Sequence, residues 1–209
     1  MKYFIADTHF AHESLIMNFP RHRPGTKELF ASIEEHDQYL LDAINLRVRR
    51  EDELFILGDF AWKKPGKYRQ QINCRHVSLI RGNHDKPGVC KNVFGEVPYV
   101  RNIKIRATGD ENNTHLNVVL CHTPMAFWDG SHRGSCHLYG HCHGQREVTL
   151  NRALGWHRRS FDAGVDNLVK MTGGFSPIDE DEVYALFISL TGHDDPTFYD
   201  NHQAMRKVD

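Results

Sequence analysis

Side chains that commonly bind metal ions are grouped in short polar blocks along the chain. Each block directly follows a short apolar run, and the five blocks are, in order, Asp7-Thr8-His9, Gly58-Asp59, Gly82-Asn83-His84-Asp85, His122 and Gly140-His141-Cys142-His143. Imidazole nitrogens and carboxylate oxygens are common ligands of divalent transition metals, and histidine also transfers protons near neutral pH. The blocks therefore indicate metal-dependent or acid–base chemistry in a chain that holds 15 histidines.

Taken singly, each block is a weak signal. Asp-x-His occurs in surface turns, and Gly-Asp is a common turn dipeptide. The two histidines at 141 and 143 would point to the same side of an extended strand, which suits a shared ligand. Because all five blocks occur in order and each ends an apolar run, coincidence is a poor explanation.

The apolar runs before the blocks have the length and composition of β-strands. Strands are predicted at residues 3–6, 54–57, 77–80, 116–121 and 137–139, with a further one at 183–188. Ser32 and Glu35 form a possible capping box, and Leu40, Ile44 and Val48 recur every four residues, which predicts a helix between the first two strands. A weaker helix is predicted over residues 68–73.

Alternating strands and helices favour an α/β fold with right-handed crossovers. In such sheets, ligands bind beyond the carboxyl ends of the strands, so the five blocks should converge. A glycine before Asp59, Asn83 and His141 would let the backbone turn sharply where each strand ends.

Length and charge limit the alternatives. The 209 residues suit a single domain, with a polar C-terminal tail expected from about residue 191. Twenty-six basic and 27 acidic residues give a net charge of −1, which argues against a generic nucleic-acid binder. No long apolar run predicts a membrane span or a signal peptide, and five cysteines without a CxxC pair favour a reducing cytoplasm.

The five blocks resemble the signature of the calcineurin-like metallophosphoesterase family, which reads D-x-H, GD, GNH[DE], a lone His and GHxH. The resemblance covers about residues 3–170, and residues 161–166 with 175–177 are similar to the closing segment of that family. One departure is that Cys121 precedes His122, where the family usually has Gly or Ser. That departure concerns local packing more than metal ligation.

The resemblance implies an α/β fold of a particular kind, a four-layer α/β/β/α sandwich with two mixed β-sheets flanked by helices. It also implies two divalent transition metal ions, with Mn preferred and Fe, Zn, Ni or Co as alternatives. In the family pattern, one ion is held by Asp7, His9 and His143. The other is held by Asn83, His122 and His141, and Asp59 bridges the two ions.

The catalytic roles implied by the resemblance fall on His84 and Asp85. A water activated between the two ions would attack phosphorus in line, while His84 assists the leaving group. Asp85 would accept a hydrogen bond from the His84 ring and fix its orientation. His12 and Arg23 are candidates for substrate binding, with a solvated loop as the alternative for both.

The resulting hypothesis is a dinuclear metal-dependent phosphohydrolase acting on a phosphate ester. A phosphodiesterase on small or nucleotide substrates is preferred to a phosphomonoesterase. One alternative is a phosphatase or nuclease that processes a nucleotide or a short nucleic-acid end. The other is a metal-binding scaffold without catalysis, which intact His84 and Asp59 disfavour.

Overall fold

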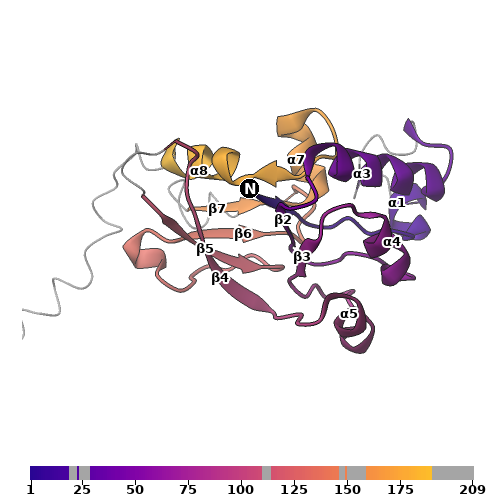
Figure 1. The fold of residues 1–209 in the computed structure, drawn as a ribbon, viewed down its shortest axis with the longest axis horizontal. Helices are drawn as coiled ribbons and strands as arrows, with labels where there is room; N and C mark the ends of the chain where they lie inside the picture. Colours follow the sequence, from indigo (N-terminus) through magenta and orange to yellow (C-terminus); the bar gives the residue numbers. More distant parts are fainter. Residues whose placement is uncertain (19–22, 24–28, 110–113, 146–148, 150–158, 190–209) are drawn as a thin grey trace, which may run out of the picture.

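Two four-stranded sheets carry the fold in the computed structural model, which describes residues 1–18, 23, 29–109, 114–145, 149 and 159–189 (Figure 1). The first sheet has the order β3-β2-β1-β8, and the second has the order β4-β5-β6-β7. The strands of the first sheet are β1 (Lys2–Ile5), β2 (Glu53–Ile56), β3 (His76–Leu79) and β8 (Ile178–Asp179). Those of the second are β4 (Val100–Ile105), β5 (Leu116–Cys121), β6 (Cys136–Tyr139) and β7 (Ser160–Asp162).

Both sheets are mixed. In the first, β1, β2 and β3 are parallel, with Phe4 opposite Phe55, and β8 runs antiparallel to β1. In the second, β5, β6 and β7 are parallel, and β4 is antiparallel to β5. The sheets meet where Ala6 bridges Gly164, and buried side chains from both belong to one hydrophobic cluster.

Helices pack around these sheets. They are α1 (Glu13–Asn18), α3 (Ile33–Arg47), α4 (Pro65–Gln71), α5 (Pro87–Phe94), α7 (Val165–Thr172) and α8 (Glu180–Ser189), with a short 3₁₀ helix, η1 (Ser131–Arg133). Figure 1 shows α1, α3, α4 and α5 gathered around the β2–β3 side of the molecule, while β4–β7 fill the other side. The predicted α/β class is confirmed, with two mixed sheets and helices.

The strands that precede the polar blocks agree with the prediction within about one residue at each end. Helix α3 also begins as predicted, because the Ser32 side chain accepts a hydrogen bond from the Glu35 amide at 3.2 Å. Leu40, Ile44 and Val48 are all buried on the face of this segment that meets the core. The weaker helix is α4, which begins at Pro65, three residues earlier than expected.

The predicted strand at 183–188 is wrong, because these residues form most of α8. Asp179 accepts a hydrogen bond from the Glu182 amide at 2.9 Å, and the Glu182 carboxylate accepts one from the Asp179 amide at 2.8 Å. This reciprocal capping box starts a helix. Val183 and Phe187, one turn apart, then bury the apolar side of that helix.

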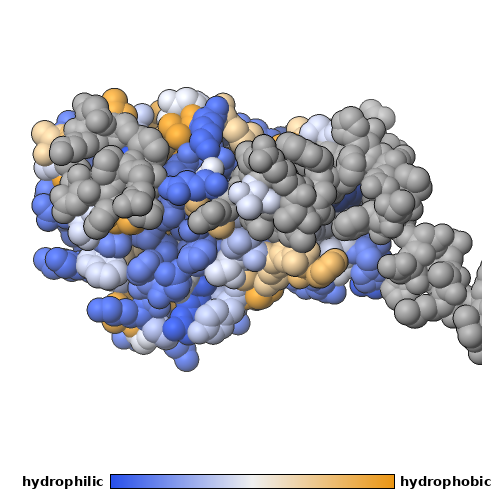
Figure 2. All heavy atoms as spheres, turned by 180° about the vertical axis from the view of Figure 1, so that it is seen from behind, coloured by the Kyte–Doolittle hydropathy of each residue, from blue (hydrophilic) through white to orange (hydrophobic). Residues whose placement is uncertain are grey.

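One face of the molecule is drawn in Figure 2 with its surface coloured by hydropathy. Where it is coloured, the side of the molecule drawn in Figure 2 is mainly hydrophilic, with separate apolar patches. None of the described helices has the length and apolar character needed to cross a membrane. None of the five cysteines, all of which lie in the described part of the chain, forms a disulfide. The C-terminal tail predicted from about residue 191 lies outside the described residues.

Candidate metal centre

The five polar blocks leave the carboxyl ends of β1, β2, β3, β5 and β6 and meet in one place. Three contacts join blocks that are far apart in sequence. The Asp7 carboxylate accepts a hydrogen bond from the His141 amide at 2.8 Å, Asp59 Oδ2 lies 3.4 Å from His122 Nε2, and Asn83 Oδ1 lies 2.9 Å from His141 Nδ1. The structure therefore brings together all seven side chains that the sequence proposes as metal ligands.

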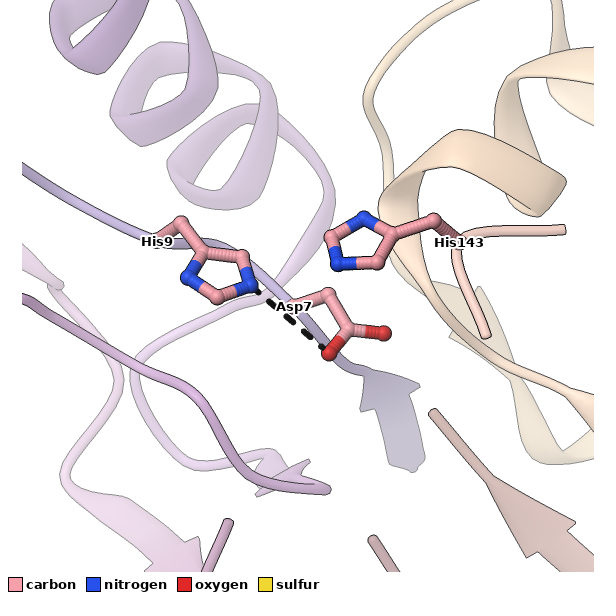
Figure 3. Close-up of side chains that lie close together, drawn as sticks. All are labelled: Asp7, His9 and His143. Atoms are coloured by element: carbon pink, nitrogen blue, oxygen red, sulfur yellow. Dashed lines mark ion pairs between the residues drawn. The ribbon is translucent and has the colours of Figure 1, made fainter. Parts of the chain in front are cut away.

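The first ligand group consists of Asp7, His9 and His143. One ligand atom from each of the three lies within 4.8 Å of the others. Figure 3 shows the His9 and His143 rings side by side, with the Asp7 carboxylate beneath them. The two rings are stacked at 5.2 Å between centroids, and His9 Nε2 lies 4.0 Å from Asp7 Oδ1. This arrangement suits a cation held between a carboxylate oxygen and imidazole nitrogens.

Two atoms of this group are buried without a hydrogen-bond partner among the described residues, Asp7 Oδ1 and His9 Nε2. An unpartnered buried polar atom costs free energy, so such atoms are rare in folded proteins. Burial raises the pKa of Asp7 to about 7, although the neighbouring His143 and His122 act in the opposite direction. Burial, with the nearby Arg23 charge, lowers the pKa of His9 and keeps its ring neutral. A bound cation would satisfy both atoms.

The second ligand group consists of Asn83, His122 and His141. Asn83 Oδ1 lies 2.9 Å from His122 Nε2 and 2.9 Å from His141 Nδ1, so one amide oxygen and two ring nitrogens face a common point. Burial lowers the pKa of His122, but its hydrogen bond with Asp59 and the Asp7 charge outweigh burial and raise it to about 9. The fields of the two carboxylates thus favour positive charge here.

Asp59 lies between the two groups. Its Oδ2 atom is 3.7 Å from His9 Nε2 in the first group and 3.4 Å from His122 Nε2 in the second. Asp7 also approaches both groups, because ligand atoms of Asp7, Asp59 and His122 lie within 4.8 Å of one another. The arrangement therefore places carboxylate oxygens where two cations could share them.

Five of the seven candidate ligands have a strained backbone. The φ angles of Asp7, His9, Asp59, His141 and His143 lie between 49° and 71°, in the left-handed region that residues with a side chain rarely occupy. Strain of this kind persists where the surrounding structure holds it, and it concentrates at functional sites. The concentration of such residues in the candidate ligand set supports a binding role for it.

Two glycines make room for the ligands. Gly58 has φ +90°, as a turn at a strand end requires, and a Cβ there would lie 2.4 Å from His122 Nδ1. Gly82 does not have positive φ; instead, a Cβ on it would lie 2.2 Å from Asp59 Oδ1. The expected sharp turn is thus found at Gly58, whereas Gly82 is needed for the close approach of the Asp59 carboxylate.

Two ligand histidines are oriented by partners outside the ligand set. His143 Nδ1 lies 2.6 Å from Asp166 Oδ2, and His122 Nδ1 lies 2.8 Å from the Leu57 carbonyl oxygen. When Nδ1 is hydrogen-bonded in this way, Nε2 remains as the nitrogen that faces a metal ion. In the sequence, Asp166 stands out only as part of the segment 161–166. Its role depends on contact with His143, which lies 23 residues earlier.

Arg23, a candidate for substrate binding, is buried and is not among the described residues that line the cavity beside the candidate ligands. Its side chain is 1% exposed, and its Nε donates to Asp166 Oδ1 at 2.9 Å. The same guanidinium donates to the carbonyl oxygens of Asp7 and Thr8 and lies 3.0 Å from His36 Nε2. Arg23 therefore ties the backbone of the first block to Asp166, which in turn orients His143.

We expect Arg23→Ala to lower the free energy of unfolding by about 3–5 kcal/mol, because it leaves the buried Asp166 carboxylate without its cation. Arg23→Lys should recover only part of this loss, since an ammonium lacks the guanidinium fork. Chemical denaturation followed by circular dichroism measures the effect, with Arg75→Ala at an exposed position as the control. Unchanged stability together with a raised KM would instead assign Arg23 to the substrate.

Asp85 does not orient the His84 ring, which corrects the prediction. Its Oδ2 accepts hydrogen bonds from the amides of Asp59 and Gly82, at 2.9 and 2.8 Å, and its Oδ1 accepts one from the Phe60 amide at 3.1 Å. Burial raises the pKa of Asp85, and the amide of Gly82 opposes that shift. Asp85 thus joins the turn after β2 to the turn after β3 and is a positioning residue.

His84 is at the edge of the ligand set, and its side chain is 41% exposed. Its amide donates to Asp59 Oδ1 at 2.9 Å, and its Nε2 lies 4.0 Å from Asp59 Oδ2. His84 also lines a cavity of about 300 Å³ together with His9, Asn83, His141 and His143. The ring is therefore placed to meet a molecule that enters this cavity.

His12 is buried beside His84. Its ring stacks on Trp62 at 4.2 Å between centroids, and its Nδ1 lies 3.2 Å from His9 Nδ1. Burial, with the charge of His84, lowers the pKa of His12 to about 4, so the ring is neutral at physiological pH. His12 packs beside the site, and Trp62 is a neighbour that the sequence patterns did not single out.

In sequence, the chain is similar to a phage protein and, over a shorter stretch, to an archaeal protein. No protein-family model matches it. It is 26% identical over 213 residues to the Gene 66 protein of Mycobacterium phage L5, covering 88% of this chain and 92% of that protein. An uncharacterized protein of Methanocaldococcus jannaschii is 36% identical over 90 residues, which are 41% of this chain and 47% of that protein.

A similar fold is found among solved crystal structures. A protein of unknown function from Aquifex aeolicus matches with a TM-score of 0.63 and 23% identity, over 89% of this chain and 98% of that one. This likeness shows a shared fold.

Proposed function

We propose that this chain is a dinuclear metal-dependent phosphohydrolase of the calcineurin-like metallophosphoesterase type, acting on phosphodiesters. The two mixed sheets and their helices support an α/β/β/α sandwich as part of this proposal. The observation that carries it is the position of Asp59 Oδ2, 3.7 Å from His9 Nε2 and 3.4 Å from His122 Nε2. A carboxylate between two sets of imidazole ligands is suited to binding two cations.

The residues present fit two such ions. Asp7, His9 and His143 would hold one, Asn83, His122 and His141 would hold the other, and Asp59 would be shared. Imidazole nitrogens combined with carboxylate and amide oxygens suit Mn, Fe, Zn, Ni or Co better than Ca. The unpartnered buried atoms Asp7 Oδ1 and His9 Nε2 support the same assignment.

Different groups in the site have different roles toward a bound ester. When present, two divalent ions supply charge neutralisation at the phosphoryl oxygens and lower the pKa of a water molecule. His84, whose amide donates to Asp59, lines the cavity and gives a proton to the leaving oxygen. Asp85 fixes the turns that carry Asp59 and His84 relative to each other by accepting hydrogen bonds from both.

Elemental analysis and turnover assays test the proposal together. We expect two transition metal ions per chain and hydrolysis of bis(p-nitrophenyl) phosphate faster than of p-nitrophenyl phosphate. Removing the ions with a chelator should abolish turnover and lower Tm, since a ligand present at a thousand times its Kd stabilises the folded state by about 4 kcal/mol.

Refilling the chelated protein with Mn should restore both turnover and Tm. A reconstituted protein that binds metal but hydrolyses neither ester at neutral to mildly alkaline pH would contradict the proposal. That outcome would favour the metal-binding scaffold.

A further inference from the structure

A second cavity lies beside the candidate metal centre. It measures about 230 Å³, and its lining includes Trp62, Lys63, Lys64, Lys86 and Val89. Trp62 connects the two cavities, because its ring also contacts His84, which lines the first one, at 5.5 Å between centroids. The proposed function does not use this second cavity.

The second cavity is positively charged. Lys63, Lys64 and Lys86 are exposed, none of them forms an ion pair among the described residues, and no acidic side chain belongs to the described lining. Helix α5 begins at Pro87 beside Lys86, without a side-chain cap and without an acidic residue in its first turn. The partial positive charge of that helix end adds to the charge of the lysines.

Lys64 has an unusual backbone. Its φ of 50° and ψ of 52° place it in the left-handed region, which a lysine rarely adopts. The residue directly precedes α4, so its conformation sets how the chain enters that helix at the cavity rim. As with the metal ligands, the position of a strained residue beside a cavity agrees with a binding role.

Trp62 offers a flat surface between the two cavities. One side of its ring is stacked on His12, with ring planes 5° apart, and yet 44% of the residue remains exposed. Exposed aromatic rings beside basic side chains are a recurrent way of binding single-stranded nucleic acid, because every base can stack on them. A nucleobase on Trp62 would place its flanking phosphates toward the two cavities.

We propose that the lysine cavity, formed by Lys63, Lys64 and Lys86, binds a phosphate of a single-stranded oligonucleotide whose neighbouring phosphodiester lies in the metal centre, with a base stacked on Trp62. The placement of the cleaved phosphodiester in the metal centre rests on the proposed function. The net charge of −1 disfavours binding along a duplex, but a cluster of three lysines is enough to hold a short strand end.

Binding is tested with a fluorescent phosphorothioate octathymidylate, whose linkages keep their charge and resist hydrolysis. We expect Lys63→Glu with Lys86→Glu to raise its Kd about tenfold and to lower the slope of log K against log salt by about 1–2. Lys91→Glu with Lys104→Glu makes the same change of charge at exposed positions outside the cavity and should leave Kd within about twofold. The milder pair Lys63→Ala and Lys86→Ala should give a smaller loss in the same direction.

Trp62 provides a second test. Trp62→Ala should raise the Kd for octathymidylate about tenfold, and Trp62→Phe should recover most of the affinity because it keeps an aromatic face. The proposal would be overturned if octathymidylate bound with equal affinity to the native protein, to Lys63→Glu with Lys86→Glu, and to Lys63→Ala with Lys86→Ala. Displacement of the probe by ATP but not by unlabelled octathymidylate would also overturn it, in favour of a nucleoside polyphosphate.

Turnover of bis(p-nitrophenyl) phosphate separates this proposal from the proposed function. That small diester has no second phosphate to occupy the lysine cavity, so the lysine variants should hydrolyse it at the native rate. If the lysine variants keep both native turnover of this diester and native affinity for octathymidylate, the role of the lysine cavity is overturned and the proposed function stands. If the lysine variants lose affinity for octathymidylate but the native protein hydrolyses no ester, the role of the lysine cavity is supported and the proposed function is overturned.

Discussion

Asp59→Asn is expected to release both metal ions and to reduce phosphodiester turnover by more than about a hundredfold. Loss of an outer partner of a metal ligand already costs roughly 10–100-fold in affinity or activity, and a shared ligand should cost more. Asparagine keeps the volume of the side chain, but its amide nitrogen cannot bind a cation. The change removes the charge that lies between His9 and His122.

Elemental analysis of purified Asp59→Asn, alongside turnover of bis(p-nitrophenyl) phosphate, measures this result. Asp42→Asn is a matched control, because Asp42 is an exposed helix residue whose carboxylate accepts a hydrogen bond from Gln38. The control should retain two ions and native turnover. Two ions retained in Asp59→Asn would show that Asp59 is not the shared ligand, and a single lost ion would assign it to one site.

The position of the candidate ligands was predictable from the sequence because a local rule governs it. A short apolar run followed by a polar block predicts where a strand ends, and parallel strands bring their carboxyl ends to one edge. Asp7, Asp59 and Asn83 leave three parallel strands of the first sheet, and His122 and His141 leave two parallel strands of the second. The contact between the two sheets at Ala6 and Gly164 then brings the two sets together.

The roles of Arg23 and Asp85 were not predictable in the same way, because their partners are set by packing. Arg23 pairs with Asp166, 143 positions later, and nothing near Arg23 in sequence distinguishes that role from a phosphate contact. Asp85 is adjacent to His84, which made a hydrogen bond between them plausible. Its carboxylate instead satisfies three backbone amides in two turns that close only in the folded chain.

Helix α8 and the lysine cavity show two further limits. The apolar run 183–188 has the composition of a strand, and the capping box formed by Asp179 and Glu182 just before it makes it a helix instead. The lysine cavity is not visible in the sequence for another reason. Net charge averages over the whole chain, whereas Lys63, Lys64 and Lys86 meet only when the starts of α4 and α5 lie side by side.

His84→Ala is expected to keep both metal ions and to slow turnover of a dinucleotide phosphodiester by roughly 10²–10⁴-fold, the usual contribution of a general acid. The substitution removes the ring but leaves the amide that donates to Asp59, so the shared carboxylate keeps its position. Elemental analysis should therefore give the native metal content. His76→Ala, which removes an exposed imidazole on β3, is the control and should change neither metal content nor turnover.

Substrates with different leaving groups distinguish proton donation by His84 from a role in packing. A p-nitrophenolate leaves without a proton, whereas the alkoxide released from a dinucleotide phosphodiester needs one. If His84 gives that proton, His84→Ala should slow the dinucleotide far more than the p-nitrophenyl ester of the same nucleotide. Equal losses for the two substrates would mean that the ring only binds the phosphoryl oxygens or fills the cavity wall, since neither role depends on the leaving oxygen.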